Sequence, residues 1–323
     1  MKHSLTNIQK VADDIKSIKI QWATNVAKAA LEIIISELKT KKFKTIKELE
    51  SFVKQGAKLL MKARATEPML FNGMKCGLVQ LTSSKVSGLT SWKESPIKQV
   101  NQLQTKVIKS LKMYLLDVQW EEKIRPKIGA KIIKSGYNIM THCHSGSVVK
   151  VLTTARDMGK KIHVYNSETR PLYQGRKTSL DLLKAGVPDT MVTEWSAVFF
   201  TDNVYESEVN VDIVLIGSDC IKLNGDVYNK IGSFAIAMSA WHSWIPVYVV
   251  GSLTKVDTEW KVKIEKRPGS EVRPDAPRWL DIINYAFDMV PAKFITGIIT
   301  EYGIIPPKDI KRYVKTYYPW MMT

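Results

Sequence analysis

Cysteines are few in this 323-residue sequence, long hydrophobic runs are missing, and each shortage excludes a class of protein. Cys76, Cys143 and Cys220 are too scattered to suggest a disulfide framework, so free thiols are expected. The longest apolar runs, such as "VDIVLIG" at 211–217, are much shorter than a membrane span. The first residues also lack the apolar core of a signal peptide. These features predict a cytoplasmic protein with no membrane partner.

Several common active-site signatures are missing as well. No G-x-G-x-x-G follows the first predicted strand, and neither G-x-x-x-x-G-K-[ST] nor G-x-S-x-G occurs. The sequence therefore does not favour dinucleotide binding, P-loop chemistry or an α/β-hydrolase nucleophile elbow. No cofactor is predicted. Acid–base chemistry on a small phosphorylated substrate is what remains.

Positively charged residues are in large excess. The formal net charge is +17, which favours anionic partners such as nucleotides or sugar phosphates. The lysines are spread along the chain, a pattern also typical of the surfaces of heat-adapted proteins. Because no nucleic-acid-binding module is recognisable, nucleic acid is not an expected partner.

The first 130 residues predict a helical N-terminal domain. Apolar residues recur at steps of three and four from Ile15 to Leu38, and further helices are expected over 46–63 and 96–123. Glycines and serines between Gly73 and Ser95 predict an interruption between the last two helices.

Residues 131–323 instead predict a Rossmann-like α/β domain, in which strands alternate with helices. Such alternation indicates a doubly wound parallel sheet, in which ligands bind beyond the carboxyl ends of the strands. Helices are expected over 145–158 and 179–184, and a third helix is expected at "NKIGSFAIAMSAWH". One apolar stripe of this third helix contains Ile231, Phe234, Ala235, Met238 and Trp241. The expected strands are "NIMTHC", "KIHVYNSE", "TMVTE", "VDIVLIGSD" and, as the last interior strand, "IPVYVVGS".

Two reactive side chains follow predicted strands. Cys143 lies just before a helix N-terminus, where the backbone amides, the helix dipole and a neighbouring imidazolium would favour the thiolate. A buried, inert cysteine is the alternative. Asp219 follows the strand "VDIVLIG", where a turn-capping aspartate is the alternative. His142 and His144 invite a zinc hypothesis, but no spacing indicates further ligands, so no metal is predicted.

Other polar residues at these strand ends predict a phosphate site. Amides at Ser145 and Gly146 and at Gly175, next to Arg176, together with the cation of Arg170, suit a phosphate group. Asn229 and Lys230 are expected to open the third helix, where solvent exposure is the alternative.

Four segments resemble one family in the same order: "THCHSGSV", "SETRPLYQGRKTSLDLLKAGVP", "VDIVLIGSDCIKLNGDVYNKIGS" and "NYAFDMVPAKFITGIITEYGIIPP". The family contains regulatory subunits of initiation factor 2B, methylthioribose-1-phosphate isomerase and archaeal ribose-1,5-bisphosphate isomerase. The stretch "ETRPLYQGR" is most similar to the last of these. The resemblance implies a cysteine–aspartate catalytic pair at Cys143 and Asp219, a phosphorylated sugar as substrate, and a homodimer or homohexamer. The substrate contacts that it implies are Arg64, Ser145, Gly146, Arg170, Gln174, Gly175, Asn229 and Lys230.

The sequence departs from the family in one place. Isomerases of the family carry an Arg-Gly-Ala segment in the first long helix, where this chain has Gln21, Trp22 and Ala23. This leaves open a different isomerase substrate, such as methylthioribose 1-phosphate, or a non-catalytic regulatory subunit that binds a translation initiation factor. Aromatic residues near Trp22 and in the C-terminal "YYPWMMT" would then form a partner surface or, alternatively, a homo-oligomer interface.

Overall fold

The computed structural model divides into two compact units and describes residues 3–20, 22–64, 66–86, 95–202, 209–259 and 264–322. One unit comprises Met1–Trp120 and Val314–Thr323, and the other comprises Glu121–Tyr313. A helical N-terminal region and a mostly parallel sheet confirm the predicted fold class. The domain boundary expected at residue 130 stays a prediction. No helix in the described part of the chain combines the length and apolarity needed to cross a membrane.

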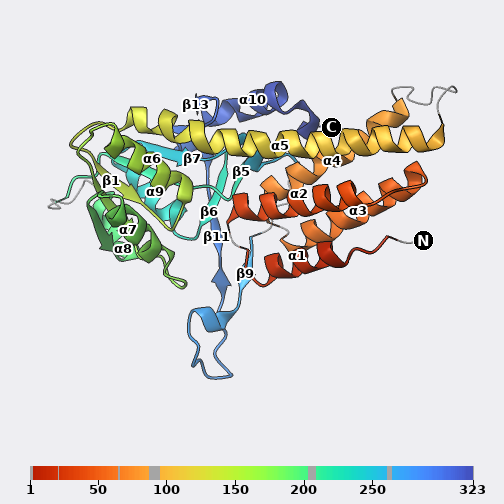
Figure 1. Ribbon diagram of the computed structural model, residues 1–323. Helices are drawn as coiled ribbons and strands as arrows, with labels where there is room; N and C mark the ends of the chain where they lie inside the picture. Colours follow the sequence, from red (N-terminus) through yellow and green to blue (C-terminus); the bar gives the residue numbers. More distant parts are fainter. Residues whose placement is uncertain are drawn as a thin grey trace. The chain divides into compact units, whose positions relative to one another are not determined.

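The N-terminal helices of the helical unit are drawn in red to yellow in Figure 1, and its C-terminal residues are drawn in dark blue. Its core contains buried side chains from every one of its long helices, together with partly buried Trp320 from the C-terminus. Of the C-terminal aromatic residues, Tyr318 is buried and the Trp320 ring lies 5.8 Å from the Tyr114 ring, whereas Tyr317 is 45% exposed. The helices are α1 (Thr6–Lys16), α2 (Ala23–Thr40), α3 (Ile46–Ala63), α4 (Pro68–Val86) and α5 (Pro96–Ile132), of which α5 continues into the second unit.

The periodicity read from Ile15 onward belongs to two helices and not to one. The φ angles of Ile18 and Trp22 are 62° and 71°, which a continuous right-handed helix excludes. The apolar spacing runs through the break because Ile15 and Val26 are buried in the same core. Gln21, which stands in the place of the family's arginine, lies outside the described residues.

The interruption expected between Gly73 and Ser95 is wrong for its first part, because Gly73 and Gly77 lie inside α4. A Cβ at Gly73 would lie 2.9 Å from the Tyr114 ring, and one at Gly77 would lie 2.7 Å from Leu111. These glycines allow α5 to pack closely and do not end the helix. The segment from residue 87 to residue 94, including Gly88, lies outside the described residues.

The second unit is built on a seven-stranded sheet with the order β13-β12-β7-β4-β1-β2-β3, in which only β13 is antiparallel to its neighbour. The chain runs from β1 outward to β2 and β3, and then returns to the other side of β1 with β4. The switch point of the sheet therefore lies between β1 and β4, where ligands bind in such folds. The strands are β1 (Asn138–Thr141), β2 (His163–Ser167), β3 (Asp189–Val192), β4 (Ile213–Ile216), β7 (Val247–Val250), β12 (Gly297–Thr300) and β13 (Gly303–Ile305).

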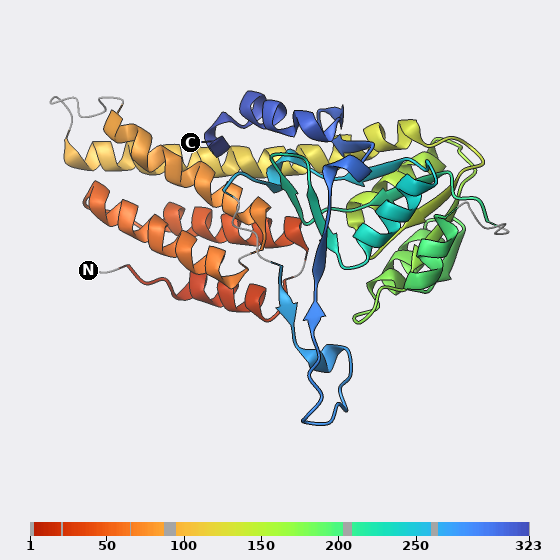
Figure 2. The same cartoon turned by 180° about the vertical axis from the view of Figure 1, so that it is seen from behind.

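Helices cover the sheet, as Figure 2 shows. The end of α5, α6 and α7 share one hydrophobic core with the sheet, centred on Ile139, Val151 and Leu215. Helices α8 and α9 pack against β2, β4 and β7. The helices of this unit are α6 (Gly146–Asp157), α7 (Gln174–Lys184), α8 (Glu194–Phe200), α9 (Ser233–His242) and α10 (Ile310–Tyr317), of which α10 ends in the other unit.

The region after β4, which includes a smaller sheet, differs from the sequence prediction in two places. Asn229 and Lys230 end strand β6 and do not open α9, which begins at Ser233. Two residues of the predicted α9 stripe, Met238 and Trp241, are 45% and 54% exposed. The strand β7 is not the last interior strand, because β12 follows it. The small sheet contains β5 (Cys220–Lys222), β6 (Val227–Lys230), β8 (Val256–Asp257) and β11 (Phe287–Val290), and β9 (Lys266–Arg267) pairs with β10 (Asn284–Tyr285).

Candidate active site

Cys143 occupies the turn between β1 and α6 in a left-handed backbone conformation, with φ at 66°. Its N–H donates to Thr169 Oγ1 at 3.0 Å, and its carbonyl accepts from Thr178 Oγ1 at 2.8 Å. Thr169 is itself left-handed, with φ at 67°. Non-glycine residues adopt this conformation only when their surroundings hold them there, and they cluster at functional sites. The backbone of Cys143 is thus held from both sides by threonine hydroxyl groups.

The thiol of Cys143 is buried, and its charge state differs from the prediction. Burial raises its pKa to about 12; the Lys230 charge lowers this pKa and the Asp219 charge raises it. The expected imidazolium is also wrong, because burial lowers the pKa values of both His142 and His144 to about 4. At neutral pH, Cys143 is therefore a thiol flanked by two neutral histidines. Desolvation outweighs the helix dipole here.

A slow, strongly pH-dependent alkylation of Cys143 follows from this charge state. Because only the thiolate is nucleophilic, the rate with iodoacetamide should still rise with pH above pH 9, with no plateau between pH 6 and pH 9. Peptide mapping of a Cys76→Ser, Cys220→Ser protein would give the rate for Cys143 alone. A plateau near neutral pH would instead show a stable thiolate.

Asp219 follows β4, which is the strand next to β1 in the sheet. Its backbone N–H donates to the carbonyl of Tyr228 at 2.9 Å, so the start of the small sheet holds it. Its side chain is partly exposed, and its negative charge acts on Cys143. Cys143 and Asp219 thus lie at the carboxyl ends of the two strands that form the switch point.

The N-terminus of α6 lies against the end of β4. Ser145 caps this helix, and its hydroxyl accepts from the Val148 N–H at 3.4 Å. A Cβ at Gly217 would lie 2.8 Å from the Ser145 side chain and 3.5 Å from Asn229 Oδ1. At Gly146 a Cβ would meet no atom within 4 Å. Free space beside the amides of a helix N-terminus suits an anion.

Helix α7 brings two further candidates to Cys143. Gln174 is the first residue of α7, and its Oε1 lies 3.7 Å from the Cys143 sulfur. A Cβ at Gly175 would lie 1.8 Å from the carbonyl oxygen of Ser167. Only glycine lets the start of α7 approach the end of β2 this closely.

Gly175→Ala should therefore destabilise the protein and displace α7, at a cost of about 1–3 kcal/mol from overpacking. Gly146→Ala is the matched control, since free space surrounds that position and a change within about 0.5 kcal/mol is expected. Urea denaturation of the two variants and the parent measures the difference. Equal stability of all three would contradict the close packing at Gly175.

The remaining candidates are held in different ways. Asn229 is buried and donates to Ser233 Oγ at 2.8 Å, while Lys230 Nζ lies 5.1 Å from the Phe287 ring. Arg170 is exposed, and its Nη2 donates to the Val272 carbonyl at 2.9 Å. Arg64 belongs to the helical unit, where its Nε lies 3.7 Å from Glu67. Gln174 and the charge of Lys230 thus act on Cys143 directly, while Ser145 and Asn229 lie beside Gly217 at the end of β4. The contacts given above for Arg64 and Arg170 are with Glu67 and Val272 instead.

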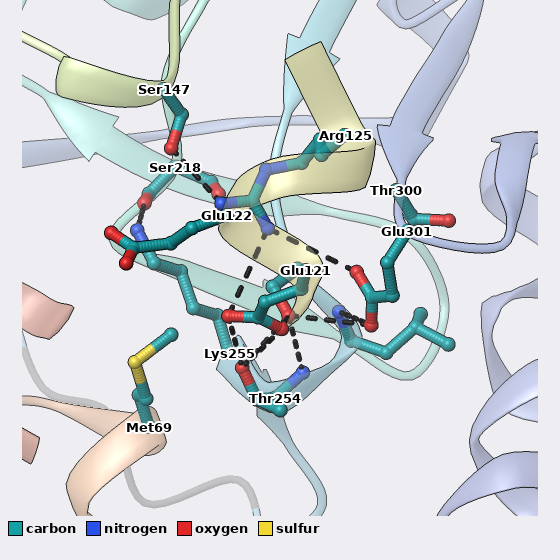
Figure 3. Close-up of polar contacts among 12 residues, drawn as sticks. Met69, Glu121, Glu122, Arg125, Ser147, Ser218, Thr254, Lys255, Thr300 and Glu301 are labelled. Atoms are coloured by element: carbon teal, nitrogen blue, oxygen red, sulfur yellow. Dashed lines mark hydrogen bonds and ion pairs between the residues drawn. The ribbon is translucent and has the colours of Figure 1, made fainter. Parts of the chain in front are cut away.

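A buried charge cluster lies at the same edge of the sheet, beyond β7 and β12 (Figure 3). Arg125 Nη1 is 3.9 Å from both Glu121 and Glu301, and its Nη2 donates to Ser147 Oγ at 3.1 Å. Burial and the neighbouring Glu301 raise the pKa of Glu121 to about 8, while Arg125 lowers it. Through Ser147, this cluster contacts the first turn of α6.

Sequence reasoning missed the residues that hold this site in place. Thr169 and Thr178 bond the Cys143 backbone, and Arg125 bonds the first turn of α6. No motif or spacing signals them, because each acts through a contact between segments far apart in the chain. Among the described residues, no three His, Cys, Asp or Glu side chains gather in a way that could hold a metal ion.

A mostly parallel sheet with reactive side chains at its switch point defines a Rossmann-like fold, and folds of this class bind ligands at that point. The chain belongs to the initiation factor 2 subunit family, whose model matches residues 19–307, and this confirms the predicted resemblance.

Individual relatives support this assignment. A ribose 1,5-bisphosphate isomerase of Pyrococcus furiosus is 31% identical over 324 residues, covering 96% of this chain and 94% of that protein. A methylthioribose-1-phosphate isomerase of Pelotomaculum thermopropionicum is 36% identical over 202 residues, covering 57% of this chain and 54% of that protein. The crystal structure of translation initiation factor eIF-2B from Pyrococcus horikoshii matches this chain with a TM-score of 0.75 at 23% identity. The match covers 94% of this chain and 98% of that chain. The relatives thus include isomerases of phosphorylated sugars.

Proposed function

We propose that the protein is an aldose–ketose isomerase that converts ribose 1,5-bisphosphate into ribulose 1,5-bisphosphate. The observation that carries this proposal is the position of Cys143 and Asp219 at the ends of β1 and β4, where the Asp219 charge raises the pKa of the Cys143 thiol. Relatives named for this reaction match the chain over nearly its whole length, which supports the choice of substrate.

The substrate has a phosphate on its C1 oxygen, so its ring cannot open through a free hemiacetal. Because burial raises the pKa of the Cys143 thiol, this group carries a proton at neutral pH and can act as the first proton donor. In the proposed reaction, Cys143 protonates the ring oxygen as the bond from C1 to that oxygen breaks. The resulting thiolate then takes the proton from C2, which gives a phosphate-bearing enol.

The second half of the reaction restores both groups. Cys143 returns its proton to C1 while Asp219 takes the proton of the O2 hydroxyl, and the ketone forms at C2. Asp219 then passes this proton to the Cys143 thiolate. No net proton is consumed, and each positioned acid or base contributes about 10²–10⁴-fold to the rate.

Phosphate recognition is assigned to the amides at Ser145 and Gly146 and to Lys230, with Gln174, Gly175 and Asn229 next to them. Helix N-termini and ammonium groups both suit phosphate dianions. Arg64 and Arg170 stay predicted substrate contacts. Exposed Trp195 and Trp244, at 83% and 92%, support a homodimer or homohexamer, and a cytoplasmic location is proposed.

A regulatory subunit that binds a translation initiation factor is the second candidate. Trp22 favours it, because the Arg-Gly-Ala segment of the isomerases is replaced here and Trp22 keeps a φ of 71°. Glycine adopts this conformation more readily than tryptophan. The third candidate, methylthioribose-1-phosphate isomerase, differs in the group carried at C5.

One experiment distinguishes these candidates. The purified chain is incubated separately with ribose 1,5-bisphosphate and with methylthioribose 1-phosphate, and product formation is followed by ¹³C NMR. The proposal predicts the ketose only from the bisphosphate. Turnover of neither sugar, together with co-purification of an initiation factor, would support the regulatory subunit instead.

A further inference from the structure

His142 forms a buried bridge between two segments of the candidate site. It is the residue before Cys143, and 1% of its surface is exposed. Its Nδ1 is hydrogen-bonded to Ser167 Oγ at the end of β2, and its Nε2 lies 2.7 Å from the carbonyl oxygen of Ile231. The imidazole thus joins β2 to the turn that separates β6 from α9.

The partners of the ring determine which nitrogen carries the hydrogen. A carbonyl oxygen can only accept, so Nε2 must be the N–H that donates to Ile231. In the neutral ring Nδ1 is then an acceptor, and it must accept from the hydroxyl of Ser167. Burial lowers the pKa of His142 to about 4, which keeps the ring neutral at physiological pH.

At one end, the bridge holds the turn that follows Lys230. The N–H of Ile231 donates to the Ala286 carbonyl at 3.0 Å, and the N–H of Gly232 donates to Asp288 Oδ2 at 2.7 Å. Gly232 has φ at 102°, and a Cβ there would lie 3.2 Å from the imidazole. The turn therefore lies directly against the ring of His142, with Ala286 and Asp288 holding its amides.

At the other end, the bridge leads to the backbone of Cys143. Ser167 Oγ lies 3.1 Å from Thr169 Oγ1, which accepts from the Cys143 N–H. Polar contacts therefore run without a gap from the Ile231 carbonyl to the amide of Cys143.

We propose that His142 is a positioning residue that fixes Lys230 relative to Cys143, and thereby a bound phosphate relative to the thiol. The inference rests on the proposed function for its effect on turnover. Its geometric part does not, because the contacts of His142 with Ser167 and Ile231 exist without any substrate.

Two substitutions each remove one half of the bridge. His142→Gln can place an amide N–H near the Nε2 position and so keep the bond to Ile231. His142→Asn can place an acceptor near Nδ1 and keep Ser167, but it cannot reach Ile231. His142→Asn should therefore lose about 10²-fold in kcat/KM, the effect of a 1 Å misplacement, whereas His142→Gln should stay within about tenfold of the parent. His163→Asn, a histidine change on β2 outside this bridge, is the control.

A readout without substrate separates this inference from the proposed function. The alkylation profile of Cys143 should shift to higher pH in His142→Asn, because Lys230 is no longer held near the thiol, and should stay in place in His142→Gln and His163→Asn. If ribose 1,5-bisphosphate is not turned over by the parent but this shift occurs, the proposed function fails and the bridge stands. If folded His142→Asn and His142→Gln match the parent in this profile, the bridge has no positioning role.

The tautomer gives a second test, which is read on the parent protein. In ¹⁵N-histidine-labelled protein, long-range ¹H–¹⁵N spectra should show one histidine locked as the Nε2–H form between pH 5.5 and pH 8. Its signal is assigned by its loss in His142→Gln. A mixture of tautomers, or an Nδ1–H form, would overturn the inference.

Discussion

Cys143→Ser and Asp219→Asn are each expected to abolish turnover of ribose 1,5-bisphosphate while binding of the substrate persists. Serine keeps the size of the side chain but cannot supply a thiolate to take the C2 proton, and asparagine cannot take the proton of the O2 hydroxyl. Since each positioned acid or base contributes about 10²–10⁴-fold, losses of at least this size are expected in kcat. Single-turnover kinetics and calorimetric titration measure chemistry and binding separately.

Cys220→Ser is the matched control for the thiol. Cys220 is also buried and follows Asp219 directly, but it lies in strand β5. Its replacement should leave kcat within a few-fold of the parent. Full activity of Cys143→Ser would end the proposed mechanism, and equal losses in both serine variants would point to a packing defect.

Arg125→Met is expected to cause the largest loss of stability in the α/β unit. Arg125 is 3% exposed, and its removal would leave Glu121 and Glu301 facing each other in the protein interior. Breaking a buried ion pair by deleting one partner costs about 3–5 kcal/mol. Urea denaturation at pH 6 and pH 9 measures this cost.

The sign of the pH dependence follows from the carboxyl groups. The pKa of Glu121 is raised to about 8 in the folded protein, and without Arg125 it would rise further. The folded variant then binds more protons than the unfolded chain, so its stability falls as pH rises through this range. The loss should therefore be larger at pH 9 than at pH 6. Adding Glu301→Gln to Arg125→Met should recover part of it, and no recovery would show that the two carboxyl groups do not interact.

The sheet was predictable from sequence because its strands are short apolar runs with turn residues on either side. The run "VDIVLIG" became β4, and the 46–63 helix was predicted at its observed ends. The position of Cys143 and Asp219 was predictable too, since parallel strands place their carboxyl ends at one edge. Local pattern and strand order were sufficient for these features.

Other features depended on contacts that no local pattern records. Gly73 and Gly77 looked like helix breakers, but they lie where α5 packs against α4. The exposure of Met238 and Trp241 was not predictable, because a helix with apolar residues on several faces has no preferred direction from sequence alone. The thiolate prediction failed because burial depth, which decides the pKa of Cys143, is a property of the folded chain.

The left-handed conformations of Cys143, Thr169 and Tyr173 have a consequence for engineering. Glycine would adopt these backbone angles without steric cost, so a selection for heat resistance alone would tend to replace such residues. Each replacement would remove a side chain that contacts the site: the thiol, the hydroxyl that bonds the cysteine amide, or the ring that stacks on Arg176. A glycine at any of these three positions should therefore raise the melting temperature and lower turnover. Stabilising substitutions should be sought elsewhere in the molecule.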